Sequence, residues 1–70
     1  MFYFVVDIKE MNKIEVYNNI FNLENHYTIT KNKIGKRIGK QTINHVVWEQ
    51  YVIKNDNGSI KLGWIRKNDL

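Results

Sequence analysis

The fold is decided by residues 42–66, which read TINHVVWEQYVIKNDNGSIKLGWIR. Thr42–Lys54 is rich in β-branched and aromatic residues, a composition typical of strands. Asn55-Asp56-Asn57-Gly58 follows, and the Asn-Gly pair can supply the two positive φ values that a tight hairpin turn needs. Ile60–Arg66 then returns as the partner strand. The stretch therefore predicts a β-hairpin that turns at Asn57-Gly58.

Shorter alternating segments precede this hairpin. In residues 2–8 the even-numbered side chains are apolar, which predicts a first strand with that side facing the core. Ile14 and Val16 alternate with Glu15 and Tyr17 and predict a second strand, and residues 26–30 predict a short third one. No segment keeps a helical apolar period for the ten or so residues that a helix would need. The chain is therefore expected to be all-β, with about five strands and no long helix.

Two glycines interrupt the alternation between these segments. Gly35 and Gly39 lie in a near-repeat, Ile34-Gly35-Lys36-Arg37 followed by Ile38-Gly39-Lys40-Gln41. Two units of four residues are too short to be a structural repeat. Glycines at this spacing indicate turns or bulges, where the backbone needs a positive φ or a bend.

The end of the chain carries a recognisable order of features. Trp48 lies in the first strand of the hairpin, the turn spans Asn55–Ser59, and Gly63-Trp64-Ile65 is followed by residues 66–70, which read RKNDL. This order resembles the C-terminal half of bacterial SH3-type domains, which end in a Gly-Trp-aliphatic strand and a short 3₁₀ turn closing on a Leu. The resemblance implies a small SH3-like β-barrel, with Trp64 and Leu70 both largely buried.

Length and composition restrict the classes of protein. The 70 residues are expected to form one domain, residues 1–70, and the absence of cysteine excludes disulfides, thiolate zinc sites and thiol nucleophiles. His26 and His45 are the only imidazoles, so no metal and no cofactor is expected. No stretch is apolar over the roughly 20 residues that a bilayer requires, and no export signal opens the chain. A cytoplasmic location is therefore expected, and the missing cysteines fit a reducing compartment.

Positive charge is concentrated in one segment. The net charge is +4, and no acidic residue occurs between Glu24 and Glu49, where five basic residues fall. That segment therefore carries +5 and the rest of the chain −1. A local basic patch accelerates association with an acidic partner. Together with nearby aromatic rings, it predicts a partner-binding surface made of Lys33, Lys36, Arg37, Lys40, Trp48 and Tyr51, with an exposed ring such as Trp48. At least one of Trp48 and Trp64 is expected in the core, because so short a chain needs large side chains to fill its centre.

The sequence favours binding over catalysis. His26, His45, Asp7 and Glu49 have no spacing that forms a known catalytic motif, so no enzymatic activity is expected. The first hypothesis is a protein-binding module that recognises an acidic surface, because small sheets offer edges for strand addition. One version of it is an intracellular inhibitor or modulator of a host protein, encoded by a phage or mobile element. The alternative is a small basic barrel that binds nucleic acid through its lysines and stacked aromatic rings.

Overall fold

The computed structural model describes residues 12–70, which form an antiparallel sheet. Its five strands are β1 (Lys13–Tyr17), β2 (His26–Thr30), β3 (Ile34–Ile43), β4 (Val46–Lys54) and β5 (Ile60–Arg66). Two 3₁₀ turns, η1 (Lys31–Lys33) and η2 (Lys67–Asp69), are the helical segments in this part of the chain. The expected all-β class with five strands and no long helix is thus confirmed. The expected strand in residues 2–8 lies outside the described residues.

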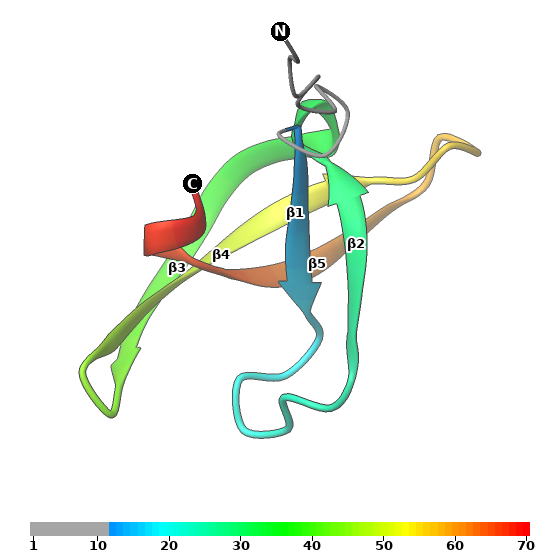
Figure 1. The fold of residues 1–70 in the computed structure, drawn as a ribbon. Helices are drawn as coiled ribbons and strands as arrows, with labels where there is room; N and C mark the ends of the chain where they lie inside the picture. The colour runs from blue at the N-terminus through cyan, green and yellow to red at the C-terminus, as the bar shows by residue number, and fades with distance from the viewer. Residues whose placement is uncertain (1–11) are drawn as a thin grey trace, which may run out of the picture.

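The strand order is β2-β1-β5-β4-β3, so the sheet has β2 at one edge and β3 at the other. Figure 1 shows β1 and β2 crossing the longer strands β3, β4 and β5. One register pair, Tyr17 with Trp64, joins β1 to β5, and this narrow junction allows the sheet to bend there. No helix of residues 12–70 is long and apolar enough to cross a bilayer.

The sheet is open, so the expected closure into an SH3-like barrel is not found in residues 12–70. Closure requires the two edge strands to pair side by side. Here the end of β2 leads through the three residues of η1 directly into β3, so the two edges meet end to end. The expected 3₁₀ turn near the chain end is present as η2, but Leu70 is 48% exposed. The predicted burial of Leu70 is wrong, because the chain end lies beyond β5 and η2 and packs into neither cluster of buried side chains.

Apolar side chains on the two faces of the sheet form two clusters. The first core buries Ile14, Val16, Ile53 and Ile65, with Tyr51 and other partly buried side chains packed against it. The second core lies on the opposite face and buries Tyr17, Ile20 and Trp48, with Ile43 and Trp64 packed against it. Neighbouring residues of β5 divide between them, since Ile65 enters the first core and Trp64 the second.

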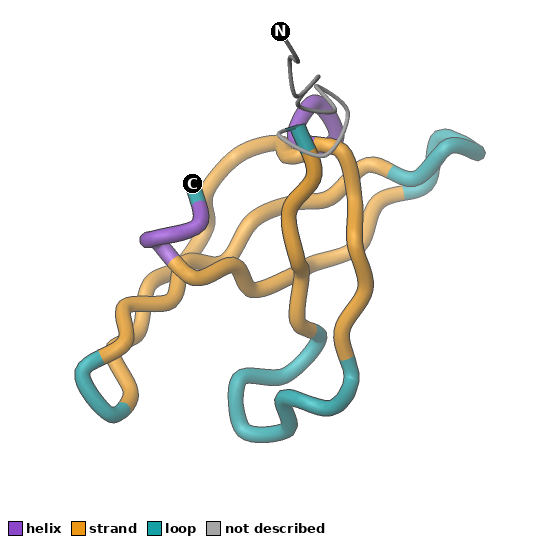
Figure 2. The backbone as a smooth tube through the Cα atoms, viewed as in Figure 1, coloured by secondary structure: helices purple, strands orange, loops and turns teal. Residues whose placement is uncertain are grey.

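Two hairpins have turns of different kinds, which Figure 2 shows as loops at the ends of β4. Between β3 and β4, Ile43 pairs with Val46, and the two residues between them, Asn44 and His45, have φ values of 50° and 68°. Positive φ at both central residues is the signature of a type I′ turn. The tight turn therefore occurs at Asn44-His45, and the prediction of such a turn at Asn57-Gly58 is wrong.

The connection between β4 and β5 is a longer loop. Its five residues, 55–59, contain a turn in which the Gly58 N–H donates to the Asn55 carbonyl at 3.1 Å. The Asn55 N–H donates to the Ser59 carbonyl at 2.8 Å, which closes the base of the loop. Gly58 has a φ of 88°, so its expected positive φ is confirmed. The predicted hairpin of β4 and β5 is also confirmed.

Candidate functional site

Most of the predicted basic surface lies on the edge strand β3. Lys36, Arg37 and Lys40 are exposed on this strand, and Lys33 lies just before it in η1. The segment that carries these three side chains is thus a strand. Pairing with β4 shifts register between Ile34 and Arg37 and again between Arg37 and Gly39. These irregularities confirm the bulges expected around the two glycines, and they change the direction of the side chains along the edge.

Arg37 and Tyr51 are joined through a buried carboxylate. Glu49 is only 5% exposed, and its Oε2 accepts a hydrogen bond from Arg37 Nη1 at 2.7 Å (an ion pair). The Tyr51 hydroxyl donates to Glu49 Oε1 at 3.0 Å. The hydrogen bond from Arg37 holds the pKa of Glu49 below its usual range, while burial raises the pKa of Tyr51. The Arg37 side chain nevertheless remains 56% exposed, so its position is fixed while one face still meets solvent.

The other lysines of the predicted surface differ in their partners. Lys33 forms an ion pair with Asp56 of the β4–β5 loop. The side chains of Lys36 and Lys40 form no ion pair or hydrogen bond within residues 12–70. Ile38, between them in sequence, is 46% exposed. The free charge of β3 therefore lies at Lys36 and Lys40, on both sides of an exposed apolar residue.

Trp48 does not belong to this surface. It is 4% exposed in the second core, where its ring meets the Tyr17 ring edge-on with centroids 5.0 Å apart. The prediction that Trp48 offers an exposed ring is wrong. Its side of the sheet is covered by Ile20 from the β1–β2 loop, and no local pattern in the strand could indicate that contact. Trp64 is the half-buried tryptophan.

A second group of lysines lies together at a place that no local sequence pattern predicts. Lys13, Lys33, Lys54 and Lys61 line a depression of about 380 Å³ between β2 and the β4–β5 loop. Lys54 and Lys61 come from the two arms of one hairpin, where Lys54 pairs with Ile60 and Ile53 with Lys61. These lysines are spread over most of the chain, so only the strand pairing brings them together. We call this site the lysine depression.

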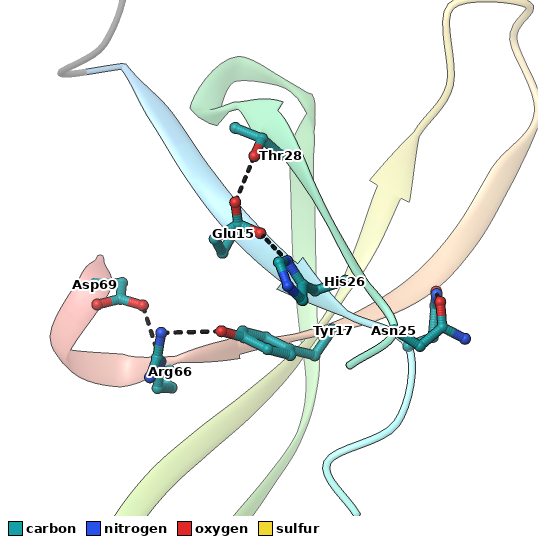
Figure 3. Close-up of polar contacts among 8 residues, drawn as sticks. Glu15, Tyr17, Asn25, His26, Thr28, Arg66 and Asp69 are labelled. Atoms are coloured by element: carbon teal, nitrogen blue, oxygen red, sulfur yellow. Dashed lines mark hydrogen bonds and ion pairs between the residues drawn. The ribbon is translucent and has the colours of Figure 1, made fainter. Parts of the chain in front are cut away.

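Polar side chains also connect β1, β2 and the chain end, as Figure 3 shows. Glu15 Oε2 lies 2.6 Å from His26 Nδ1, and Thr28 Oγ1 donates to Glu15 Oε1 at 2.5 Å. These two hydrogen bonds, that of Thr28 first, lower the pKa of Glu15. Arg66 donates to the Tyr17 hydroxyl at 3.0 Å and to Asp69 at 3.2 Å.

A carboxylate beside an imidazole can orient a general base, but such a base needs a nucleophile within hydrogen-bond reach. In the described part of the chain, the Thr28 hydroxyl bonds to the carboxylate and not to the ring. Nor do three potential metal ligands gather anywhere in residues 12–70. The cluster therefore joins β1 to β2 and η2 to β1, which holds the crossing strands together.

Comparison with protein-family models, with curated proteins and with solved structures finds no match to this chain.

Proposed function

We propose that the chain is a non-catalytic binding module that recognises an acidic protein through the edge strand β3. One observation carries the proposal. β3 is a ten-residue strand whose outer side pairs with no other strand of residues 12–70, and it bears the free charges Lys36 and Lys40 around the exposed Ile38. An extended segment of a partner can add to such an edge through main-chain hydrogen bonds.

Charge on β3 selects which strand can be added. Edge strands commonly carry lysines, which prevent pairing with further copies of the same edge. Two copies of β3 would bring Lys36 and Lys40 against equally basic strands, whereas an acidic segment would neutralise them. The same two side chains therefore disfavour self-association and favour an acidic partner. Ile38 adds an apolar contact between the charges.

Arg37 extends this surface with a pre-oriented cation. Its bond to the buried Glu49 fixes the guanidinium, so less conformational entropy is lost when a partner binds. A guanidinium has five N–H donors, and further donors remain for a carboxylate of the partner. We therefore propose Lys36, Arg37 and Lys40 as the partner-binding residues. Tyr51 contributes indirectly, because its hydroxyl donates to the Glu49 carboxylate that positions Arg37.

The proposal also includes the type of domain, its cellular location and its biological role. The order of features around Trp64 supports a relationship to SH3-type domains, and the absence of cysteine supports action in a reducing, cytoplasmic setting. A small module of this kind could act by occupying a host protein, as an inhibitor encoded by a phage or mobile element would. Nucleic acid is the weaker candidate, because Trp48, the tryptophan expected beside the basic strand, is buried and has no free face on which a base could stack.

The test compares two double variants with the same change in net charge. The edge pair is Lys36→Glu with Lys40→Glu, and the depression pair is Lys54→Glu with Lys61→Glu. Each variant and the native chain are used to capture proteins from nuclease-treated lysate of the source cells. We expect one partner to be retained by the native chain and the depression pair and to be lost with the edge pair. Exposed charges contribute little to stability, so melting temperatures should stay close to that of the native chain.

Strand addition has a second signature in hydrogen exchange. Binding of the captured partner should slow exchange of β3 amides, because their outer N–H groups become hydrogen-bonded. Material that is captured from untreated lysate but not after nuclease treatment, with a steep fall in affinity as salt rises, would show a nucleic-acid ligand and overturn the proposal. A partner bound equally by the edge pair and the native chain would overturn the choice of β3.

A further inference from the structure

The lysine depression is a second charged site, separate from the outer edge of β3. Its walls come from the start of β1, most of β2, η1, the end of β4, the start of β5 and the loop between β4 and β5. Neither Lys36 nor Lys40 lines it. We propose that this depression binds the phosphoryl group of a small ligand, an inorganic phosphate compound or a nucleotide. This inference goes beyond the proposed protein-binding function and does not depend on it.

Charge in the depression is strongly unbalanced. Four lysines line it, Lys13, Lys33, Lys54 and Lys61, and Asp56 is the one acid among the described residues of its lining. The side chain of Lys54 forms no hydrogen bond or ion pair within residues 12–70. Concave surfaces lined by one sign of charge focus the field and raise the local concentration of counter-ions. The site therefore attracts a multiply charged anion.

Two of these lysines are held by partners that an anion could replace. The Lys61 ammonium lies 3.8 Å from the centroid of the Tyr27 ring, in a cation–π contact. Lys33 forms its ion pair with Asp56, a side chain that is 89% exposed. Exposed contacts of both kinds are weak. An anion in the depression would keep both ammonium groups in place and neutralise them more completely.

The chemistry of the lining favours a phosphoryl group over a carboxylate. Lysine binds phosphate as a point charge. It does not form the planar, bidentate pair of hydrogen bonds that arginine forms with a carboxylate. A phosphoryl group presents three oxygens with a charge near −2, which can be shared by several ammonium groups. The depression, at about 380 Å³, lies in the size range of small-ligand sites.

Inorganic pyrophosphate is the probe for the first experiment. It is titrated into the full-length, isotope-labelled native chain, and amide shifts are followed by NMR at constant ionic strength maintained with chloride. We expect saturable shifts centred on Lys33, Lys54 and Lys61, and affinity at least about tenfold weaker in the depression pair, since two charged hydrogen bonds are lost. The edge pair should bind pyrophosphate nearly as well as the native chain.

A variant that binds pyrophosphate more tightly cannot be explained by misfolding. Asp56→Asn removes the acid of the depression and frees Lys33, so pyrophosphate should bind several-fold more tightly. Glu24→Gln is the matched control, because it removes the same charge from an exposed loop residue outside the depression. An unfolded variant could not bind more tightly. Equal affinities for Asp56→Asn and Glu24→Gln would overturn the assignment of the site.

Two further ligands distinguish the sources of the phosphoryl group. Equal binding of ADP and pyrophosphate would assign an inorganic ligand, and tighter binding of ADP would assign a nucleotide. Binding of a short oligothymidylate without binding of pyrophosphate would overturn the proposal in favour of a nucleic-acid backbone. Amide shifts that fail to saturate, or that spread equally over β3, would indicate non-specific screening of positive charge. That result would also overturn the proposed phosphoryl site.

Discussion

At the scale of single residues, Gly63 is the position with the least space. A Cβ added there would lie 2.3 Å from Val16 Cγ1 and 3.1 Å from Ile53 Cγ1, and both side chains belong to the first core. Neither has room to move, because Val16 and Ile53 are fully buried. Gly63→Ala should therefore lower the free energy of unfolding by about 1–3 kcal/mol, measured by urea denaturation.

Gly39 provides the control at the same scale. A Cβ there would meet the Oε1 of Gln50 at 3.1 Å, which is the flexible end of a long side chain. Gly39→Ala should change the free energy of unfolding by no more than about 0.5 kcal/mol. If both glycines tolerated alanine equally, the close contact of β5 with β1 at Val16 would be wrong.

At the scale of elements, the turn at Asn44-His45 can be made more stable by substitution. Both residues have positive φ, a conformation that glycine adopts without cost and β-branched residues resist. His45→Gly creates the Asn-Gly pair that type I′ turns prefer and should raise stability by up to about 1 kcal/mol. His45→Val should lower it by about the same amount or more. Thermal unfolding checks both, and identical melting temperatures for the two variants would contradict this turn.

This turn also shows how far local patterns predict the elements. β1 and β2 were predictable because their apolar residues alternate, and β4 and β5 because β-branched and aromatic residues flank a turn signal. β3 was not, because Gly35 and Gly39 interrupt its alternation, and the Asn-Gly pair at residues 57–58 gave a stronger turn signal than Asn44-His45. Which hairpin receives the tight turn is set by register with neighbouring strands. Local sequence does not contain that information.

The two candidate sites also differ in whether local sequence could predict them. The cluster on β3 could be predicted because Lys36, Arg37 and Lys40 are close in sequence. The lysine depression could not, because Lys13 and Lys61 are brought together only by the sheet order. The burial of Trp48 depends on the distant Ile20 in the same way. Contacts distant in sequence thus decide which of the aromatic and basic residues face solvent.

At the scale of the whole molecule, an open sheet has to avoid pairing with itself. β2 and β3 are both edges in residues 12–70, and β3 itself carries the exposed apolar residue Ile38. A long exposed edge beside apolar side chains is a site of aggregation unless charge protects it. The free lysines of β3 supply that charge, and the net charge of +4 adds a general repulsion between copies.

Neutralising the edge should therefore make the chain self-associate. Lys36→Gln with Lys40→Gln lowers the net charge from +4 to +2 and removes the repulsion along β3. Lys54→Gln with Lys61→Gln makes the same change in net charge at the lysine depression, so it serves as the control. Sedimentation velocity should show dimers or larger species for the β3 variant at concentrations where the control and the native chain stay monomeric.

Salt should act on the native chain in the same direction, since screening shortens the range of repulsion from about 30 Å at 0.01 M to about 3 Å at 1 M ionic strength. Association of the native chain should therefore increase with salt, whereas the β3 variant should depend on salt less. Equal association of the two glutamine variants would mean that net charge alone keeps the chain monomeric. In that case Lys36 and Lys40 would not specifically protect the edge of β3 from self-pairing. Their proposed role in favouring an acidic strand of a partner over β3 of another copy of the chain would then be wrong as well.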